Sequence, residues 1–290
     1  DGVFASADFD SDGDTILIGT NQPLSGSGSG KGSDNPQIIT GIGGDGFELD
    51  ANYTISNSAL ISIGDSTAAN VGGAGFNLTN TSNVTVSGAA STTDSSKINI
   101  QGVSGDGIDL STGSVFNSFD GTTICVLNTT GNGIDNKGIF RNENARLKLD
   151  NIGGTAIIND ENPGPESPAT LNNLEGGEIE IGLNGGGVTV GIDNGGTINN
   201  GSAATDDTGT AIRINASGTA ITQSEGTITN GDGLDNDECV LIETNTPLIV
   251  ASGTITNNDI YTTTSTVVNA ITAGIFLNNG ILVDPTNAFM

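Results

Sequence analysis

The chain has 290 residues, of which 34 are acidic and 7 are basic, so its formal net charge is −27, and it contains no histidine. Such a negative field repels nucleic acids and anionic membranes, which excludes functions that depend on a basic patch. No stretch approaches the roughly 20 consecutive apolar residues of a membrane-spanning helix. We therefore expect neither nucleic-acid binding nor membrane insertion.

The same polar composition, rich in Gly, Asn, Ser, Thr and Asp, runs through the whole chain, which favours one elongated domain over two. Disorder is one interpretation of so polar a sequence. However, Ile-x-Ile and Val-x-Val pairs recur throughout, and such pairs need a core. We expect an acidic N-terminal cap segment at residues 1–14 and one repeat domain at residues 15–290, as a piece of a larger protein.

The first segment carries aspartates at alternate positions. Asp8, Asp10, Asp12 and Asp14 are spaced as in calcium loops with oxygen ligands, and Gly13 stands at the sixth position. A complete loop has glutamate at the twelfth position, where this chain has Gly19. Calcium bound by the four aspartates is one expectation, and a metal-free acidic cap is the other. No further cofactor is expected.

Short runs that alternate apolar and polar residues follow along the chain. Alternation with period two places Ile, Val and Leu on one face of a strand and polar residues on the other. No segment combines a 3.6-residue apolar period with helix-forming composition. The runs predict strands at residues 15–18, 60–63, 83–86, 97–100, 146–149, 178–181 and 253–256.

A kernel of Gly, any residue, Gly or a small residue, and a large apolar residue returns every 22 to 32 residues. It ends at Phe47, Phe76, Ile108, Ile134, Ile157, Val188, Ile212 and Leu234. A constant kernel with variable spacing is typical of coils that share strands and differ in their loops. We predict an all-β fold, a single-stranded parallel β-helix of roughly 9–11 coils, with these eight side chains in one core. A β-sandwich is the alternative, but it favours hairpins every 8 to 12 residues.

Stacked strands lie about 4.8 Å apart, so like residues should align in rows along the axis. Ile and Val are expected to stack inside, while rows of Asn or Thr hydrogen-bond to one another. Six asparagines follow an apolar residue where the chain would turn, and Asn tolerates the left-handed backbone of such corners. They are Asn159, Asn199, Asn215, Asn230, Asn257 and Asn278.

Four of the seven basic residues fall in one stretch, at Lys137, Arg141, Arg146 and Lys148. A solvated face is one interpretation. On so acidic a body, however, the one basic region is also a candidate contact for a neighbouring subunit.

Two further sets of acidic residues are candidate sites. Asp232, Asp235, Asp237 and Glu238 form a second candidate calcium cluster. Asp206 and Asp207 suggest the carboxylate pair of a glycoside hydrolase, although their polar surroundings predict a solvated loop.

The recurring Gly-x-Gly-Ile elements, together with Gly196-Thr197-Ile198-Asn199-Asn200-Gly201, resemble right-handed parallel β-helix repeats of large bacterial surface and secreted proteins. They are most similar to autotransporter passenger regions and giant adhesin-like proteins, over most of residues 15–283. The resemblance implies an extracellular location at the bacterial cell surface. It also implies a non-catalytic adhesive module or self-assembling filament, with copies of itself, or glycans and proteins of a host or prey cell, as partners.

Members of this group divide between adhesins and polysaccharide-cleaving enzymes. The alternative function is therefore a polysaccharide lyase or glycoside hydrolase on the same scaffold. The chain has no histidine and no tryptophan, and only two tyrosines that could serve as sugar platforms. These residues favour the non-catalytic function.

The two cysteines test the solenoid prediction. Cys125 and Cys239 are 114 positions apart, or four to five coils, which is about 20 Å along an axis that rises about 4.8 Å per coil. A disulfide needs Cα atoms within about 7 Å. We therefore predict two thiols and no intrachain bridge.

Overall fold

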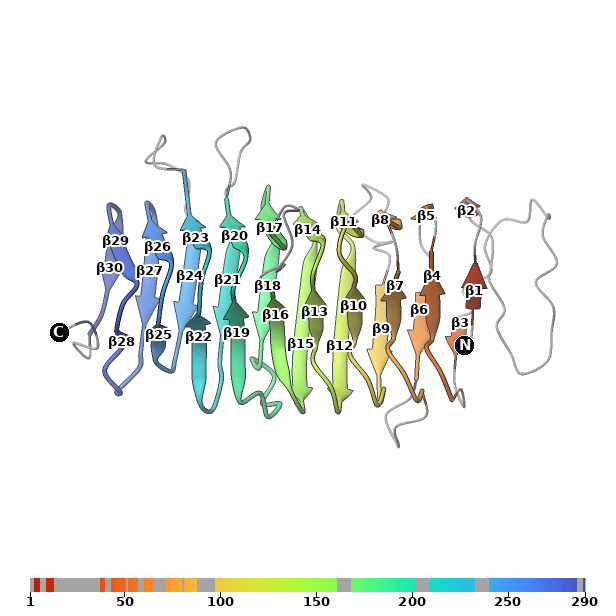
Figure 1. Cartoon of the computed structure of the whole chain (residues 1–290), viewed down its shortest axis with the longest axis horizontal. Helices are drawn as coiled ribbons and strands as arrows, with labels where there is room; N and C mark the ends of the chain where they lie inside the picture. The colour runs from red at the N-terminus through yellow and green to blue at the C-terminus, as the bar shows by residue number, and fades with distance from the viewer. Residues whose placement is uncertain are drawn as a thin grey trace.

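The fold is known from a computed structural model. It describes residues 43–50, 60–64, 71–79, 81–87, 97–160, 168–201, 209–232, 240–285 and 289, and the backbone alone of strands at 3–5, 9–12, 37–39 and 52–56. These residues form thirty strands in three ten-stranded sheets, with no helix among them. Every pairing is parallel, and each strand pairs with the strands three places before and after it along the chain (Figure 1). The chain is a single-stranded parallel β-helix of ten coils, as predicted.

Each coil contributes one strand to each sheet. Sheet A contains β1 (Val3–Ala5), β4 (Phe47–Leu49), β7 (Phe76–Leu78), β10 (Ile108–Leu110), β13 (Ile134–Asn136), β16 (Thr155–Asn159), β19 (Val190–Asn194), β22 (Thr219–Gln223), β25 (Leu248–Val250) and β28 (Ala270–Ile271). Sheet B contains β2 (Phe9–Asp12), β5 (Asn52–Ser56), β8 (Asn83–Ser87), β11 (Val115–Phe119), β14 (Ile139–Glu143), β17 (Thr170–Leu174), β20 (Thr197–Asn200), β23 (Thr227–Asn230), β26 (Thr254–Asn257) and β29 (Ile275–Asn278).

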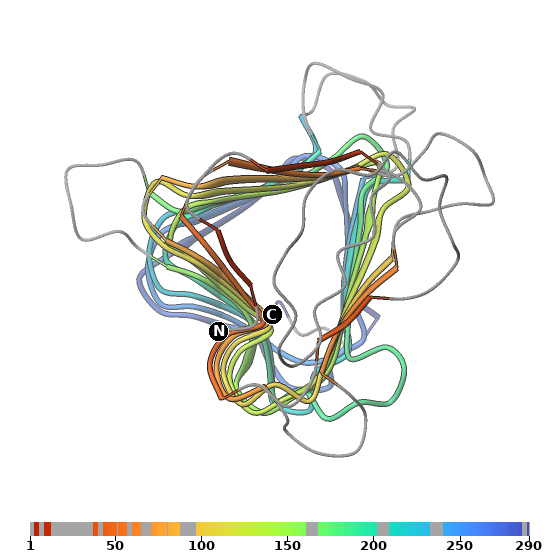
Figure 2. The same cartoon turned by 90° about the vertical axis from the view of Figure 1, so that its right-hand side faces the viewer.

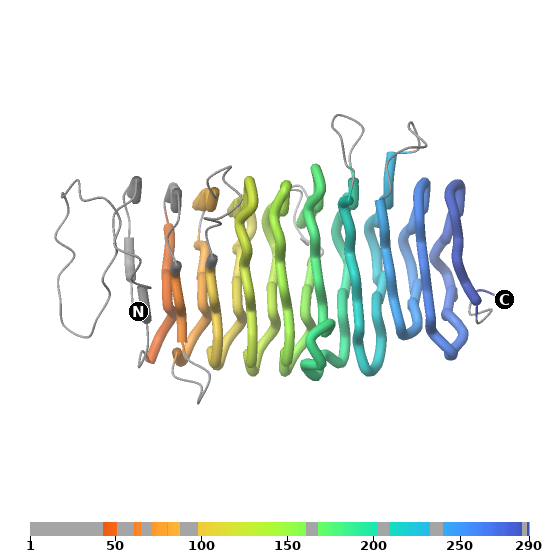
Figure 3. Tube along the Cα trace, turned by 180° about the vertical axis from the view of Figure 1, so that it is seen from behind, coloured from red at the N-terminus to blue at the C-terminus, as the bar shows by residue number. Residues whose placement is uncertain are grey.

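Sheet C contains β3 (Gln37–Ile39), β6 (Leu60–Ile63), β9 (Lys97–Gln101), β12 (Thr123–Thr129), β15 (Arg146–Ile152), β18 (Glu178–Ile181), β21 (Ala211–Ile214), β24 (Leu241–Thr244), β27 (Ile260–Thr263) and β30 (Ile281–Val283). Seen along the axis, the three sheets form the sides of a triangle (Figure 2), and the coils follow one another in chain order (Figure 3). Side chains on alternate positions point into the triangle or out from one of its faces.

The first strands pair with the coil that follows. Strand β1 pairs with β4, and β2 pairs with β5. Both lie within residues 1–14, so the sheets extend into the segment predicted to be a cap. The strand predicted at residues 15–18 lies outside the described residues.

The predicted core is confirmed wherever it is described. Seven of the eight kernel residues are at most 4% exposed and belong to one cluster, and Leu234 lies outside the described residues. The first five, Phe47, Phe76, Ile108, Ile134 and Ile157, also stack in one row of sheet A. Apolar side chains repeated at the coil spacing therefore make a continuous dry column.

The row continues at residues that the kernel did not predict. Ile157 is in register with Ile192, and Ile192 with Ile221. Val188 precedes β19, whereas Ile212 lies in β21 of sheet C. Ile212 lies outside the row because Gly-Thr-Ala-Ile occurs at 154–157, 209–212 and 218–221, and only the first and third copies enter sheet A.

Two columns of amides, buried except for Asn278 in the last coil, run parallel to the apolar core. At the ends of the sheet B strands, each Nδ2 donates to the next Oδ1 at 2.7–2.8 Å, through Asn142, Asn173, Asn200, Asn230, Asn257 and Asn278. At the ends of the sheet A strands, Asn136, Asn159, Asn194 and Gln223 are joined at 2.6–2.9 Å. Each buried amide also donates to corner carbonyls, so the column amides are paired, although Asn142 Oδ1 accepts no hydrogen bond from the described residues.

These amide columns confirm the predicted rows of hydrogen-bonded side chains. The left-handed backbone predicted for the corner asparagines is wrong. Asn159, Asn230, Asn257 and Asn278 belong to the columns, and none of the six asparagines proposed for corners has a positive φ. Asn199 instead donates to Asn172 on the outer face, and Asn215 donates to Gly182 O. Left-handed backbone falls on Asn128, Asn144 and Asn151. The chain thus uses most of its corner asparagines for their side-chain amides.

Candidate functional site

The outer face of sheet C carries a ladder of ion pairs. Lys148 Nζ lies 3.0 Å from Glu180 Oε2, and Arg146 Nε donates to Glu178 Oε2 at 2.6 Å. Arg213 then lies 3.5 Å from Glu178 Oε1 and 3.7 Å from Glu243 Oε2. Because the strands are in register, outward charges of opposite sign on successive coils meet across the sheet.

The four basic residues proposed as an assembly contact do not form one patch. Arg146 and Lys148 belong to the ladder of sheet C, whereas Arg141 projects from β14 on sheet B and Lys137 follows β13 at the corner between sheets A and B. Lys137 Nζ lies 2.7 Å from Asp135 Oδ2, and Arg141 forms no ion pair with another described residue. Three of the four charges are therefore neutralised within the chain.

The outer face of sheet A is acidic near its middle. Burial raises the pKa of Asp109 to about 6, and the nearby Asp135 and Asp106 oppose the lowering effect of Lys137. Burial likewise raises the pKa of Asp106 and Asp193. Although partial burial opposes it, the hydrogen bond to Asp135 raises the pKa of Lys137. The face thus holds one carboxylate, Asp109, with a pKa of about 6 and two others whose pKa is raised.

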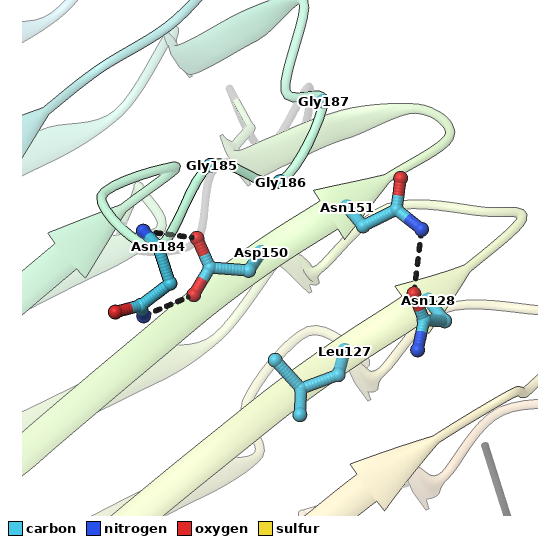
Figure 4. A pocket seen from close by; sticks show the side chains of 8 residues that line it. All are labelled: Leu127, Asn128, Asp150, Asn151, Asn184, Gly185, Gly186 and Gly187. Atoms are coloured by element: carbon cyan, nitrogen blue, oxygen red, sulfur yellow. Dashed lines mark hydrogen bonds between the residues drawn. The ribbon is translucent and has the colours of Figure 1, made fainter.

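A groove of about 640 Å³ lies where sheet C turns toward sheet A (Figure 4). It is lined by Leu127, Asn128, Asp150, Asn151, Asn184, Gly185, Gly186 and Gly187. Both carboxylate oxygens of Asp150 are occupied by Asn184, since Oδ1 accepts from the backbone N at 3.2 Å and Oδ2 from Nδ2 at 2.6 Å. Asn151 Nδ2 donates to Asn128 Oδ1 at 2.5 Å.

Amides and backbone groups therefore dominate this groove. Its one carboxylate is buried and held by the loop above it, which leaves Asn128, Asn151 and Asn184 as the polar groups nearest to solvent. Such groups can hydrogen-bond hydroxyls, but the lining holds no second acid and no nucleophile placed against a base. Sequence reasoning missed this groove. Three consecutive glycines at 185–187 are the local signal, but they also fit the kernel that ends at Val188.

Most residues of the predicted calcium sites lie outside the part of the chain that the structure describes. Asp8 and Asp14 lie outside the described residues, and Asp10 and Asp12 are known only as backbone in β2, in register with Thr54 and Ser56. Asp206, Asp207, Asp235, Asp237 and Glu238 also lie outside, in connections from sheet B to sheet C, while Asp232 is described. In the part of the chain that is described, no group of three or more acidic, cysteine or histidine side chains could hold a metal.

Cys125 lies in β12 on the outer side of sheet C and is 9% exposed, in register with Asn99 and Lys148. Cys239 lies outside the described residues, two positions before β24, which is four strands away from β12 in sheet C. That separation is about 19 Å at 4.8 Å per strand. The geometry agrees with the prediction of two thiols, which remains a prediction.

Comparison with known proteins adds no relative. No family model matches the sequence, and neither a curated protein nor a solved structure is significantly similar to it. Within the described ranges, no helix is long and apolar enough to cross a membrane.

Proposed function

We propose that this chain is a non-catalytic structural or adhesive module of an extracellular bacterial surface protein or self-assembling filament. One observation carries the proposal: ten coils stack in register into a rod whose three flat faces repeat at every coil. Repetition along an axis gives a long surface that can make many weak contacts at once, which suits adhesion and packing better than the chemistry of a single centre.

The internal amide columns support the same role. They connect the corners of successive coils through buried hydrogen bonds at 2.6–2.9 Å. Buried hydrogen-bond networks make a structure rigid. A rigid rod holds its binding faces apart from whatever anchors it, so it can act as a spacer as well as a contact.

The alternative is a polysaccharide-cleaving enzyme on the same rod. Glycoside hydrolysis needs two carboxylates at a defined separation. The groove in Figure 4 supplies Asp150 alone, with both oxygens bonded to Asn184. No described feature favours this alternative over a structural role.

The test uses the full chain on two readouts. Beads coated with the protein should adhere under flow to one another or to cells. Beads coated with a control protein whose charged residues are rearranged along the sequence should not. Incubation with a panel of acidic and neutral polysaccharides should release no reducing ends and no unsaturated products. Cleavage of any polysaccharide, or coated beads that adhere to nothing, would overturn the proposal.

A further inference from the structure

Asparagine is followed directly by glycine at six places in the chain. In such a pair the backbone nitrogen of the glycine can attack Cγ of the asparagine side chain and close a succinimide ring. Glycine favours the attack because it has no Cβ to obstruct the approach and because its backbone adopts many conformations. The pairs lie at 132–133, 184–185, 194–195, 200–201, 230–231 and 279–280.

The reaction needs only water and a base from the solvent. The glycine N–H gives its proton to the base, and its nitrogen forms a bond to Cγ. The bond from Cγ to Nδ2 then breaks, and ammonia leaves after taking a proton from water. A second water opens the ring at either carbonyl and leaves aspartate or isoaspartate. A glycine N–H that is donated to a carbonyl is held away from this attack until the structure opens locally.

In five of the six pairs, the glycine N–H is donated to a carbonyl of a neighbouring coil. The distances are 2.8–3.1 Å, from Gly133 to Thr155 O, Gly195 to Asn159 O, Gly201 to Asn173 O, Gly231 to Asn200 O and Gly280 to Asn257 O. Asn194, Asn200 and Asn230 are also fully buried, with their amides in the columns. The register that builds the rod therefore protects these pairs.

The pair at Asn184 and Gly185 lacks this protection. Gly185 N donates to none of the described residues. A Cβ on Gly185 would meet nothing within 4 Å, so its surroundings are open to water. Asn184 is exposed, and its amide oxygen lies on the side away from Asp150 (Figure 4). Both reacting groups therefore lie at the surface, in residues 182–187, which we call the groove loop.

A second pair with the same local sequence allows a comparison within the chain. Asn184 and Asn194 both stand in Asn-Gly-Gly. Asn194 is 0% exposed and its Nδ2 donates to Gln223 Oε1 at 2.9 Å. Because the two following glycines are the same, a difference in reaction rate between the two asparagines reports the fold around them.

Loss of the Asn184 amide also removes what holds the groove loop in place. Asn184 donates to both carboxylate oxygens of Asp150, from its backbone N at 3.2 Å and from Nδ2 at 2.6 Å. Within the described part of the chain, residues 183–187 make no other hydrogen bond. A carboxylate at position 184 offers Asp150 no side-chain donor, and two like charges in contact repel one another. Residues 184–187 should then move away from Asp150, which is 6% exposed beneath them.

We infer that Asn184 is a deamidation site, and that its conversion to aspartate or isoaspartate releases the groove loop from Asp150. The conversion adds one negative charge and uncovers a carboxylate in a groove that amides otherwise line. A freshly made chain and an aged chain thus present different chemistry at this one place on the rod. The inference does not depend on the proposed function, because it concerns a reaction of the chain with water.

The first experiment measures the rate at each pair. The full chain is incubated at mildly alkaline pH, and peptide mass spectrometry follows each asparagine, with fragmentation that separates aspartate from isoaspartate. Asn184 should convert first and at least about tenfold faster than Asn194, because Asn194 has to break several buried hydrogen bonds before the ring can close. In urea, where the coils are unfolded, the two should react at similar rates.

Three results would overturn the deamidation site. They are an Asn184 that stays intact, an Asn194 that converts as fast as Asn184 in the folded chain, and a rate difference between the two that persists in urea. Asn132 and Asn279 extend the comparison to pairs that are less buried, and either one converting ahead of Asn184 would also contradict the inference.

The second experiment measures release of the groove loop by carbodiimide labelling of Asp150. Asn184→Asp reproduces the product, and Asn184→Gln keeps an amide but cannot close the five-membered ring. Asp150 should be labelled in Asn184→Asp and in the aged parent, and it should be protected in the fresh parent. Labelling of Asn184→Gln should not increase with age.

Asn279→Asp is the matched control, because it adds the same charge at the other exposed pair. Its Asp150 should stay as protected as in the fresh parent. An Asp150 that remains protected in Asn184→Asp, or that is labelled equally in Asn279→Asp, would show that the groove loop is not held through Asn184.

Discussion

At the scale of single residues, the buried amides make contributions to stability that single substitutions can test. Asn173 Nδ2 donates to Gly177 O at 2.9 Å, Asn200 Oδ1 at 2.7 Å and Ala211 O at 3.1 Å, and its Oδ1 accepts from Asn142 at 2.8 Å. Asn173→Ala leaves Asn200 Oδ1 without its donor and removes one acceptor from Asn142, and each buried group left unsatisfied costs about 1–3 kcal/mol. We expect the free energy of unfolding to fall by about 3 kcal/mol or more in urea denaturation.

The neighbouring Asn172 provides the control for this prediction. It lies on the same strand but on the outer face, where its Oδ1 accepts one hydrogen bond from Asn199 at 2.9 Å. Asn172→Ala should change the free energy of unfolding by no more than about 0.5–1 kcal/mol. Equal losses for Asn172→Ala and Asn173→Ala would show that the buried column does not stabilise the rod.

Asp109 supplies a residue-scale prediction of pH dependence. Burial raises its pKa in the folded chain from 3.8 to about 6. Between these values the folded state binds more protons than the unfolded state, so the contribution of Asp109 to stability falls as pH rises through this range. Asp109→Asn should therefore stabilise the chain at pH 7 by up to about 1 kcal/mol, after allowance for solvent screening.

The same substitution should have little effect near pH 4, where Asp109 is largely protonated in the folded state. Thermal unfolding of both proteins at the two pH values measures the difference. A variant that is less stable than the parent at pH 7, or equally stabilised at both pH values, would contradict the raised pKa.

At the scale of the elements, the kernel glycines set how closely neighbouring coils approach. A Cβ on Gly107 would lie 2.5 Å from Gly133 O in the next coil and would also collide with Val126. Gly107→Ala should therefore lower the free energy of unfolding by about 1–3 kcal/mol, the usual cost of overpacking.

Gly43 is the matched control for Gly107. A Cβ there meets nothing within 4 Å, and no left-handed backbone is required. Gly43→Ala should be neutral or stabilise by up to about 1 kcal/mol, because alanine reduces the entropy of the unfolded chain. Chemical denaturation of both variants provides the comparison, and a neutral Gly107→Ala would refute the close approach of the coils.

The elements also show which features of the fold can be predicted from the sequence alone. Alternation placed β6 and β18 at their observed bounds, because inward Ile and outward polar residues are a local signal. Assignment to a sheet is not local. Gly-Thr-Ala-Ile enters sheet C at 209–212 and sheet A at 218–221 with the same four residues. Likewise, the groove forms because Asn184 reaches Asp150, 34 positions earlier, and no short motif encodes that contact.

At the scale of the whole molecule, charge repulsion opposes compaction. The net charge is −27, whereas the exposed ion pairs of the ladder are each worth about 0–1 kcal/mol. Salt weakens both the charge repulsion and the ion pairs, and the repulsion is the larger of the two effects. Raising NaCl from about 0.02 M to about 0.5 M should therefore increase the melting temperature by several degrees. A melting temperature that falls with added NaCl would mean that the ion pairs dominate.

The central claim is that successive coils lie in parallel register, and disulfide crosslinking tests it most directly. In a chain carrying Cys125→Ser and Cys239→Ser, the outward register partners Asn172 and Asn199 are both replaced by cysteine. Strands about 4.8 Å apart allow a disulfide. The comparison pair is Asn172→Cys with Thr229→Cys, two coils apart and thus separated by about 9.6 Å. Mild oxidation should close the first pair completely and leave the second reduced. A first pair that stays reduced, or a second pair that closes as readily, would contradict the parallel β-helix.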